Sequence, residues 1–592
     1  MRRFNNNAER SAQKITIKIR KKAGARITNE FRKTMKILRT LFYTLLCGVL
    51  FINISPAQNK QSNIAVNAEE AAKWREDLRY MAEQMPKFHK NLFHTMSPEH
   101  FNAAIKRLHE RIPQLARHQI IVEMAKIVAM VGDGHTNIYP TRDTKIGFRA
   151  LPVKLYLFKD GLFVRAAERE HAALVGARVT KIGNFSVEES IAKVQEMLGR
   201  DNEMGVKFFV PHLLVMPEVL HAFGIVGDME NVTLSIEKGG KQEIVTLKPA
   251  GLAEMLPPDT DTTWINKPNW GDLREGGTNA QPLWLKDPND KFRFEYFPEK
   301  RIVYAQINQG TNKENETIAD FSKRLFAFVE ANPVEKLIID LRLNRGGNGM
   351  LFRPLEIAII KSKINERGKL FVLIGRSTWS ASQFLLNNLE EYTNVIFVGE
   401  PSASKGNVYG DSRRITLPNS GMTVRVSVYY WQDWAPWDTR FWTAPEIAAE
   451  FSSEDYRTNR DPGMEAILNY SPRKSLTEII DEALTKGGVE LAVKNYRDFM
   501  AQPAHRYVST EQPLLENGQR LLNEKKPEQA LVLFKINAEA NPHSFRSYFA
   551  LGEAHFRTGN KELAIQNLEK SLAINPKHYE VSMRLKEIKQ LK

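Results

Sequence analysis

The sequence predicts a multidomain α/β protein that ends in a helical array, and three observations predict it. Its 592 residues are several times the roughly 100–200 that a typical domain uses. From about residue 301, short β-branched apolar runs alternate with amphipathic helical stretches, as in a buried parallel sheet. Residues 511–592 contain an internal repeat with a period of 34. A content of 42% hydrophobic and 26% charged residues indicates an ordinary globular chain.

Residues 1–57 have the pattern of a basic leader followed by a secretory signal peptide. Thirteen Lys or Arg and two Glu among the first forty residues give +11 of the net charge of +15, so the remaining chain offers little support for nucleic-acid binding. An apolar run over 41–54 follows, and Ser55 and Ala57 are small residues at the −3 and −1 positions of a cut after Ala57. The run is shorter than the roughly 20 residues that span a bilayer. A periplasmic or secreted protein is therefore expected, with an uncleaved membrane anchor as the alternative.

The only cysteine, Cys47, lies in that apolar run. Its removal with the signal peptide would leave no thiol, which excludes a disulfide, a thiol nucleophile and a cysteine metal site in the mature chain. Whether residues 1–34 are translated is not decided by the sequence.

Residues 58–145 predict a small helical subdomain, and residues 146–250 predict a small half-barrel. Apolar residues at helical spacing give expected helices over 68–85, 98–111 and 118–130, the second after a helix start at Ser97. The half-barrel is indicated by strands with alternating apolar residues around one helix at 187–197.

Residues 301–472 predict one α/β domain. It follows a stretch over 251–300 that is expected to be a linker or irregular cover, since residues 251–290 are rich in Pro, Asp, Asn and Trp and show no periodicity. A hairpin is expected across the turn Pro418-Asn419-Ser420-Gly421. The expected strands cover 302–307, 336–341, 370–375, 395–399, 414–417 and 423–429, and the expected helices cover 317–331, 354–361 and 380–392.

A helical connector over 473–510 leads to the repeats at 511–592. The pairs that lie 34 residues apart are Gly518 and Gly552, Leu522 and Phe556, Ala530 and Ala564, Phe534 and Leu568, and the two Asn-Pro steps at 541 and 575. This pattern resembles tetratricopeptide repeats (TPR), which are stacked helix pairs. About two repeats are present, fewer than the three usually needed for stability, so the unit is expected to pack against residues 475–500 or against a partner protein. A purely structural cap is the alternative.

Three ordered segments of the α/β domain carry residues typical of a catalytic site. The strand at 337–341 ends in the glycine-rich turn 342–349, which offers backbone N–H groups but lacks the Gly-Lys-Ser/Thr of a nucleotide site. The segment Ser377-Thr378-Trp379-Ser380-Ala381-Ser382-Gln383 begins a helix, whose dipole favours an alkoxide. The loop Gly399-Glu400-Pro401 through Lys405-Gly406 follows the next strand.

Together these segments resemble the core of the C-terminal-processing, or tail-specific, serine peptidases and their tricorn-like relatives. That family pairs an Asp-Leu-Arg-x-Asn-x-Gly-Gly turn with a Ser-Ala-Ser-Glu segment and a Gly-Glu-Pro-Thr-x-Gly-Lys-Gly loop, and this chain carries similar segments in the same order. The resemblance covers about residues 70–470 and implies a crotonase-like α/β peptidase core. It implies that Ser380 is the nucleophile, and that Ala381 with Gly346 or Gly347 forms the oxyanion hole. Lys405, 25 positions after Ser380, is a candidate base.

The chain departs from the family pattern around the lysine. Gln383 replaces the usual Glu, Ser404 replaces the Gly before the lysine, and Tyr409 stands where a lysine-orienting Gln is expected. These departures open the question of a second base.

His135, in Asp133-Gly134-His135-Thr136, is that second candidate, because tricorn-like members place a catalytic histidine after their helical subdomain. A lysine base must have its pKa lowered from about 10.4 by some three units, whereas a histidine starts near 6.5. His135 and Lys405 therefore both stand as candidate bases, with His135 slightly ahead. Asp438 is a possible orienting acid.

The resemblance implies an exported serine endopeptidase that acts on polypeptides through a Ser380 acyl-enzyme. It also implies a PDZ-like module over 146–250, on the strength of Gly161-Leu162-Phe163-Val164 and residues 176–183. The alternative is a catalytically inactive peptide- or lipophile-binding scaffold on the same fold. No cofactor or metal is expected, because His89, His94 and His100 are spaced for different helical faces and are interpreted as surface or packing residues.

Overall fold

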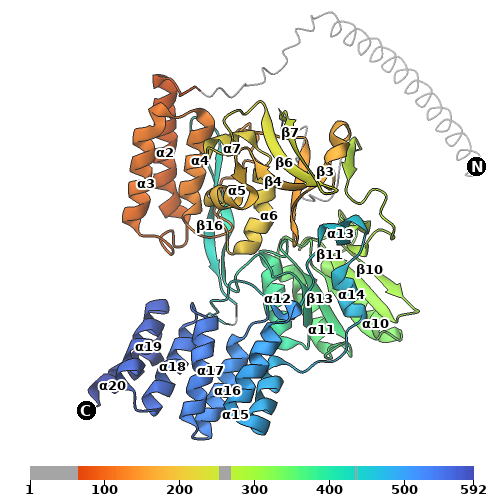
Figure 1. Cartoon of the computed structure of the whole chain (residues 1–592), viewed down its shortest axis with the longest axis vertical. Helices are drawn as coiled ribbons and strands as arrows, with labels where there is room; N and C mark the ends of the chain where they lie inside the picture. Colours follow the sequence, from red (N-terminus) through yellow and green to blue (C-terminus); the bar gives the residue numbers. More distant parts are fainter. Residues whose placement is uncertain (1–63, 252–267, 434, 437, 592) are drawn as a thin grey trace, which may run out of the picture. The chain divides into compact units, whose positions relative to one another are not determined.

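The computed structural model describes residues 64–251, 268–433, 435, 436 and 438–591, and they form a mixed α/β protein with a helical C-terminal region (Figure 1). The predicted leader and signal peptide lie outside the described residues. None of the helices in the described ranges is long and apolar enough to cross a membrane. The helices that precede the C-terminal helical region are α2 (Ala68–Phe88), α3 (Pro98–Arg111), α4 (Arg117–Ala129), α5 (Val187–Val194), α6 (Glu203–Leu213), α7 (Pro217–Ala222), α9 (Leu283–Lys286), α10 (Ile318–Ala331), α11 (Arg353–Lys361), α12 (Ala381–Tyr392), α13 (Ser453–Arg457) and α14 (Pro462–Leu468).

The N-terminal helices α2, α3 and α4 form the predicted helical subdomain, with bounds close to those expected. The Asn67 side chain accepts the N–H of Glu70 at the start of α2, and the Ser97 side chain accepts the N–H of His100 at the start of α3. Leu78, Phe101 and Met124 from the three helices are buried in one shared core. The same core also contains Val153 and Leu162 of the following sheet and Val424 of the hairpin, so the three helices share one interior with both.

A seven-stranded sheet follows, in the order β2-β3-β4-β6-β7, with β5 paired to β4 and β9 paired to β3. Its strands are β2 (Val153–Phe158), β3 (Gly161–Glu168), β4 (Arg178–Ile182), β5 (Phe185–Ser186), β6 (Val232–Lys238), β7 (Lys241–Leu247) and β9 (Trp270–Asp272). The short strands β1 (Arg149–Ala150) and β8 (Ala250–Gly251) pair with each other. The strand β9 lies in the range expected to be irregular, and its residue Asp272 makes an ion pair with buried Arg165 at 3.2 Å.

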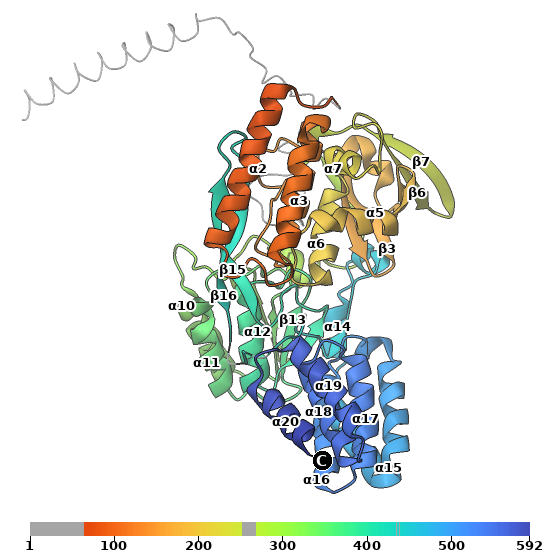
Figure 2. The same ribbon diagram turned by 90° about the vertical axis from the view of Figure 1, so that its left-hand side faces the viewer.

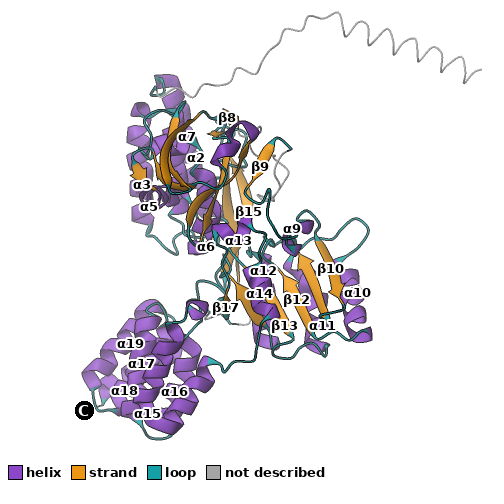
Figure 3. Ribbon diagram, turned by 45° about the vertical axis from the view of Figure 1, so that its right-hand side comes forward, coloured by secondary structure: helices purple, strands orange, loops and turns teal. Residues whose placement is uncertain are grey.

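The α/β domain contains a six-stranded sheet in the order β10-β11-β12-β13-β14-β17, drawn between helices in Figure 3. Its strands are β10 (Phe292–Phe297), β11 (Ile302–Ile307), β12 (Lys336–Asp340), β13 (Leu370–Ile374), β14 (Ile396–Gly399) and β17 (Ile447–Ala448). Alternate strand residues such as Val303 and Leu337 pack on α10, α11 and α12, whereas Tyr304 and Ile338 pack with Ile467 of α14 on the other face. Within this sheet, strands β11, β12, β13, β14 and β17 run parallel, so their carboxyl ends meet at one edge.

The edge strand β10 corrects the expectation of a linker or irregular cover over 251–300. It pairs antiparallel with β11, and Phe292 is fully buried against Phe321 of α10. The alternation of Phe292, Phe294 and Tyr296 with Arg293 and Glu295 was a strand signal that the composition of the preceding stretch obscured.

The predicted hairpin is longer than expected and forms a sheet of its own. Its strands are β15 (Val408–Thr416) and β16 (Thr423–Trp431), and they pair with each other rather than with the core sheet. Figure 2 shows the hairpin beside α2. The buried carboxylate of Asp77 in α2 accepts the N–H groups of Asn419 and Ser420 at 2.8 and 2.9 Å. The helical subdomain thereby holds the turn of the hairpin.

The C-terminal helices are α15 (Leu476–Met500), α16 (Glu511–Asn523), α17 (Pro527–Ala540), α18 (Phe545–Arg557), α19 (Lys561–Ile574) and α20 (Tyr579–Gln590). The repeated glycines lie where helices cross, because a Cβ on Gly518 would come within 2.3 Å of Phe534, and one on Gly552 within 3.0 Å of Leu568. Leu476 and Ile480 of α15 share a core with Leu514 and Leu521. The expected support from residues 475–500 is therefore confirmed.

Candidate active site

Ser380 immediately precedes α12 at the carboxyl edge of the core sheet. Its backbone has φ 60° and ψ −126°, a region that a residue with a side chain rarely occupies. Such a turn between a strand and a helix projects a serine hydroxyl outward. The N–H of Ser380 donates to Ser404 Oγ at 3.0 Å, and Thr378 Oγ1 donates to Leu341 O at 2.9 Å. The surrounding loops thus hold the strained backbone.

His135 lies within hydrogen-bond distance of Ser380, because His135 Nε2 is 3.0 Å from Ser380 Oγ. The imidazole stacks on the indole of Trp379, with 4.2 Å between ring centroids and 16° between planes. The two residues are 245 positions apart in the chain. This arrangement is that of a serine nucleophile and its base.

The carboxylate of Asp133 shapes the loop that carries His135. Asp133 Oδ1 accepts the N–H groups of His135 and Thr136 at 2.9 and 2.8 Å and the hydroxyl of Ser427 at 2.8 Å. Asp133 Oδ2 lies 2.9 Å from His89 Nε2. Burial alone would raise the pKa of Asp133, but the hydrogen bonds that it accepts from His89, Ser427 and Thr136 leave this pKa below its ordinary value. Asp133 is therefore a buried anion that folds the loop.

The β15–β16 hairpin supports the same loop from another side. Ser412 Oγ donates to the carbonyl of His135 at 2.8 Å, and Asn137 exchanges two backbone hydrogen bonds with Arg425. Gly410 of β15 lies under the imidazole, where an added Cβ would be 3.9 Å from His135 Cε1. The position of His135 thus depends on α4, on the hairpin and on the core together.

Two backbone N–H groups near Ser380 can act as oxyanion donors, those of Gly347 and Ala381. In the described part of the chain neither donates a hydrogen bond, whereas the N–H of Gly346 donates to Asn344 Oδ1 at 3.0 Å. Gly346 has φ +95° and lies so close that a Cβ there would be 2.8 Å from Ser380 Cβ. Among the expected oxyanion donors, the Gly347 and Ala381 N–H groups are therefore the ones without an acceptor in the described residues.

Lys405 and Asp438 have other neighbours. Lys405 Nζ lies 6.0 Å from the Phe441 ring centroid, and among the described residues it makes no hydrogen bond to Ser380. Asp438 Oδ2 pairs with Arg440 Nε at 2.9 Å, and no hydrogen bond joins it to His135 in the described ranges. The structure therefore brings His135 and Ser380 within hydrogen-bond distance, and leaves Lys405 and Asp438 outside this pair.

The three departures from the family pattern have structural roles here. The Gln383 side chain accepts from Ser402 Oγ at 2.6 Å and donates to Thr443 Oγ1 at 2.7 Å, and so it binds the loop after β14. Ser404 holds the Ser380 amide, as described above. Tyr409 stacks on His94 at 4.3 Å between centroids. Each position that would serve a lysine base therefore has a different partner in this chain.

One set of side chains in the described residues, His89, His94 and Asp133, has the spacing of metal ligands, within 4.8 Å of one another. The two histidines are packed against each other rather than facing apart, with 5.8 Å between ring centroids. However, His89 Nδ1 accepts the N–H of Asn91 at 3.0 Å, which leaves the proton on Nε2, facing Asp133. A metal on Nε2 would require that proton to move to Nδ1, against the Asn91 N–H. We interpret the cluster as a clamp on the loop. Burial lowers the pKa of His94 to about 4, so this ring is neutral near pH 7.

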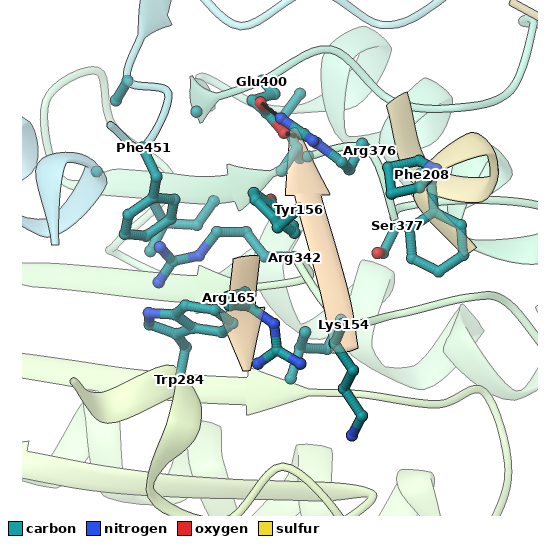
Figure 4. Close-up of a pocket in the computed structure, with 18 of the residues that line it drawn as sticks. Lys154, Tyr156, Arg165, Phe208, Trp284, Arg342, Arg376, Ser377, Glu400 and Phe451 are labelled. Atoms are coloured by element: carbon teal, nitrogen blue, oxygen red, sulfur yellow. Dashed lines mark hydrogen bonds and ion pairs between the residues drawn. The ribbon is translucent and has the colours of Figure 1, made fainter. Parts of the chain in front are cut away.

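Buried ion pairs explain two other parts of the motifs, and Figure 4 shows the one between Arg376 and Glu400. Arg376 Nε donates to Glu400 at 2.8 Å, and Arg342 pairs with Asp340 and with Asp461. They border a cavity of about 60 Å³ at the carboxyl ends of β12, β13 and β14. A second, smaller cavity of about 10 Å³ shares Phe208, Arg376 and Ser377 with the first and reaches Gly134, Asp201 and Trp379. Cavities therefore adjoin the segment that leads into Ser380.

Comparisons with known proteins agree with two parts of this description. Residues 545–578 match the tetratricopeptide repeat family. This TPR match covers α18 and α19, and repeats of this class commonly form protein-binding surfaces. No curated protein matches the chain.

Solved structures that align with the chain include two proteases. Mature CPAF complexed with lactacystin is 12% identical, covers 68% of this chain and 98% of its own, and has a TM-score of 0.48. The photosystem II D1 C-terminal processing protease is 14% identical, covers 68% of this chain and 97% of its own, and has a TM-score of 0.32. The predicted resemblance to C-terminal-processing peptidases with TPR repeats is confirmed as a resemblance.

Sequence reasoning assigned no role to Asp133, Asn344 or Asp201, which all contact the site. Asp133 and Asn344 lie inside the motifs described in the sequence analysis. An Asp or Asn two residues before a backbone N–H group indicates a turn in which the side chain accepts that N–H. Asp201 accepts the N–H of Gly134 at 2.9 Å from a loop 67 residues away. No local pattern points to that contact.

Proposed function

We propose that the chain is a serine peptidase in which Ser380 attacks the peptide carbonyl and His135 is the base. The observation that carries the proposal is the 3.0 Å separation of His135 Nε2 and Ser380 Oγ, with Ser380 on a strained turn at the start of a helix. The Gly347 and Ala381 amides supply the positive environment that a developing oxyanion needs.

The reaction follows from these positions. As Ser380 Oγ bonds to the carbonyl carbon, its proton moves to His135 Nε2 and the carbonyl oxygen becomes an oxyanion. The C–N bond then breaks, the leaving amine takes the proton from His135, and an ester on Ser380 remains. Water attacks this ester with His135 again as base, which releases the acid and restores Ser380.

The substrates we propose are polypeptides, whose side chains would enter the cavities beside Ser377. The larger cavity has apolar walls that include Trp284 and Phe451, and the arginines of its lining lie in ion pairs such as Arg376 with Glu400 (Figure 4). In the C-terminal helices, a groove of about 710 Å³ lined by Leu515, Phe534 and Phe549 would take a protein partner.

We also propose the finer assignments that accompany this function. The seven-stranded sheet with α5 serves as a PDZ-like module, supported by its antiparallel order and by the Ser186–Glu189 capping box that starts α5. The six-stranded sheet serves as a crotonase-like core. Export from the cytoplasm follows from the basic leader, the apolar run and the small residues before the cut after Ala57.

The test is labelling with a fluorophosphonate, which reacts with activated serines. Native protein should incorporate one label, and Ser380→Ala should incorporate none. Replacing His135 by Ala should slow labelling by about 10⁴-fold or more, since base and nucleophile act as a unit, and Lys405→Ala should have a far smaller effect. Failure of the native protein to label or to cleave an unfolded polypeptide would favour the inactive scaffold, and a larger loss in the Lys405 variant would assign the base to lysine.

A further inference from the structure

The ring of His135 has a second nitrogen whose role the proposed mechanism leaves open. For Nε2 to accept the Ser380 proton, the neutral imidazole must carry its own proton on Nδ1. His135 Nδ1 is buried and has no hydrogen-bond partner among the described residues. A buried N–H donor without an acceptor is an incomplete arrangement for a catalytic histidine, because a third group normally fixes the ring and stabilises its protonated form.

A complementary acceptor is present on the adjoining segment. Asp201 is 6% exposed, and its Oδ1 accepts the N–H of Gly134 at 2.9 Å, while its Oδ2 is buried with no partner in the described ranges. A Cβ on Gly134 would be 3.2 Å from Asp201 Oδ2 and 3.2 Å from the Trp379 indole, on which the His135 ring stacks. The unpaired Asp201 oxygen therefore lies beside Gly134, the residue directly before His135 and its unpaired Nδ1.

The segment that carries Asp201 is fixed against the site from both sides. The N–H of Gly199 donates to Asn137 Oδ1 at 2.7 Å, which ties it to the loop of His135. Asn202 Nδ2 donates to the carbonyl of Ser402 at 3.1 Å, which ties it to the loop that holds the Ser380 amide. Asp201 is thus held between the two loops that position His135 and Ser380.

We propose that Asp201 is the positioning residue of His135, holding the Nδ1 proton through a small rotation of the carboxylate or through one water. This inference rests on the proposed function. Asp201 fixes the tautomer in which Nε2 accepts, and its charge stabilises the imidazolium that forms during the attack. The sequence-based candidate, Asp438, is engaged by Arg440 instead.

The charges that face Asp201 agree with this role. Burial raises the pKa of the Asp201 carboxyl, while the positive charges of His135 and Lys405 oppose that rise and the negative charge of Asp133 adds to it. Lys405 then has an effect consistent with its position, because its positive charge opposes the rise in the pKa of Asp201.

The experiment is the pH profile of fluorophosphonate labelling for native protein, Asp201→Asn and Asp201→Glu. The Asn variant keeps an oxygen for the Gly134 N–H but replaces the free Oδ2 acceptor and its charge by an NH₂ donor, so it separates positioning from loop structure. We expect Asp201→Asn to slow labelling by about 10²- to 10⁴-fold and to move the acidic limb of the profile to lower pH, and Asp201→Glu to recover at least tenfold of that loss. Asp438→Asn, the comparison variant, should slow labelling less than tenfold.

A double variant tests whether the effect passes through the histidine. In the His135→Ala background, Asp201→Asn should cause no further loss, whereas a purely structural role would add its full effect. If Asp201→Asn lowers the folded fraction, the pH of the acidic limb is measured on the folded protein, and that pH decides between a positioning role and a structural one. Native protein that fails to label would overturn the peptidase itself. If native protein labels, and the Asp201→Asn variant labels at the native rate with the native pH profile, only this inference is overturned.

Discussion

Replacement of Asp133 by Asn probes the loop that carries His135. Asp133 is 2% exposed and accepts two backbone N–H groups, one hydroxyl and the His89 ring N–H. An Asn side chain can keep its oxygen on the backbone side, but its NH₂ group then faces His89 Nε2–H, donor against donor. His89 cannot reverse its tautomer without placing a proton against the Asn91 N–H. The substitution therefore leaves a buried donor unpaired whichever way the amide turns.

The expected size of the effect follows from these contacts. Loss of a hydrogen bond to a charged acceptor and one buried donor without a partner lower the free energy of unfolding by about 3 kcal/mol. A loop displaced by about 1 Å also slows labelling of Ser380 by about 10²-fold. Urea unfolding measures the first quantity and the fluorophosphonate rate measures the second. Asp160→Asn is a matched control, since Asp160 is exposed and binds only the N–H and hydroxyl of Ser453, and it should cost below about 1 kcal/mol.

The pH dependence gives a further check on Asp133. Its pKa is lowered in the folded state, so its charge contributes stability above the unfolded value of about 3.9, and this contribution is lost as the pH falls through the lower folded value. The difference in stability between native protein and Asp133→Asn should therefore shrink below about pH 4. An equal urea midpoint for the two proteins at pH 7, or an unchanged labelling rate, would refute the assigned role of the carboxylate.

Three other substitutions test separate parts of the structure. Gly346→Ala forces a Cβ to 2.8 Å from Ser380 Cβ at φ +95°. The labelling rate should therefore fall by at least about tenfold, and the free energy of unfolding in urea should fall by about 2–4 kcal/mol. A native labelling rate would contradict the close approach. Ser404→Ala removes the acceptor of the Ser380 N–H and should slow labelling about tenfold, measured as the second-order rate, with little change in the melting temperature. Gly518→Ala places a Cβ 2.3 Å from Phe534 and should lower the melting temperature of the repeats while Ser380 labels at the native rate; coupled loss of both would show that the repeats support the site.

Much of the core was predictable from local patterns, and the exceptions have identifiable causes. Strand β11 has the expected bounds, because its β-branched run is bounded clearly by polar residues at both ends. The edge strand β10 was missed because it directly follows a stretch of loop-like composition. The start of β15 at Val408 was missed because Gly410 and Asp411 disfavour a strand, and the pairing with β16 overrides that local preference.

For the site, the sequence motifs located Ser380 and both candidate bases, but only the fold separates the bases. The hydrogen bond between His135 and Ser380 joins residues that no spacing rule relates. The same is true of Asp201, whose contact with Gly134 arises from the packing of two loops. The polar groups inside a motif therefore show which turns form, whereas the partners across the site depend on how distant segments pack.

The distance along the chain between His135 and Ser380 has a consequence for how activity arises during folding. Under the proposed mechanism, the core sheet with α12 holds Ser380 without its base, because His135 belongs to the N-terminal residues 64–145. The proposed site is complete only when those residues pack against the core and the hairpin. A fragment that begins at residue 146 should stay inert, and activity should return when the missing helices are added in trans.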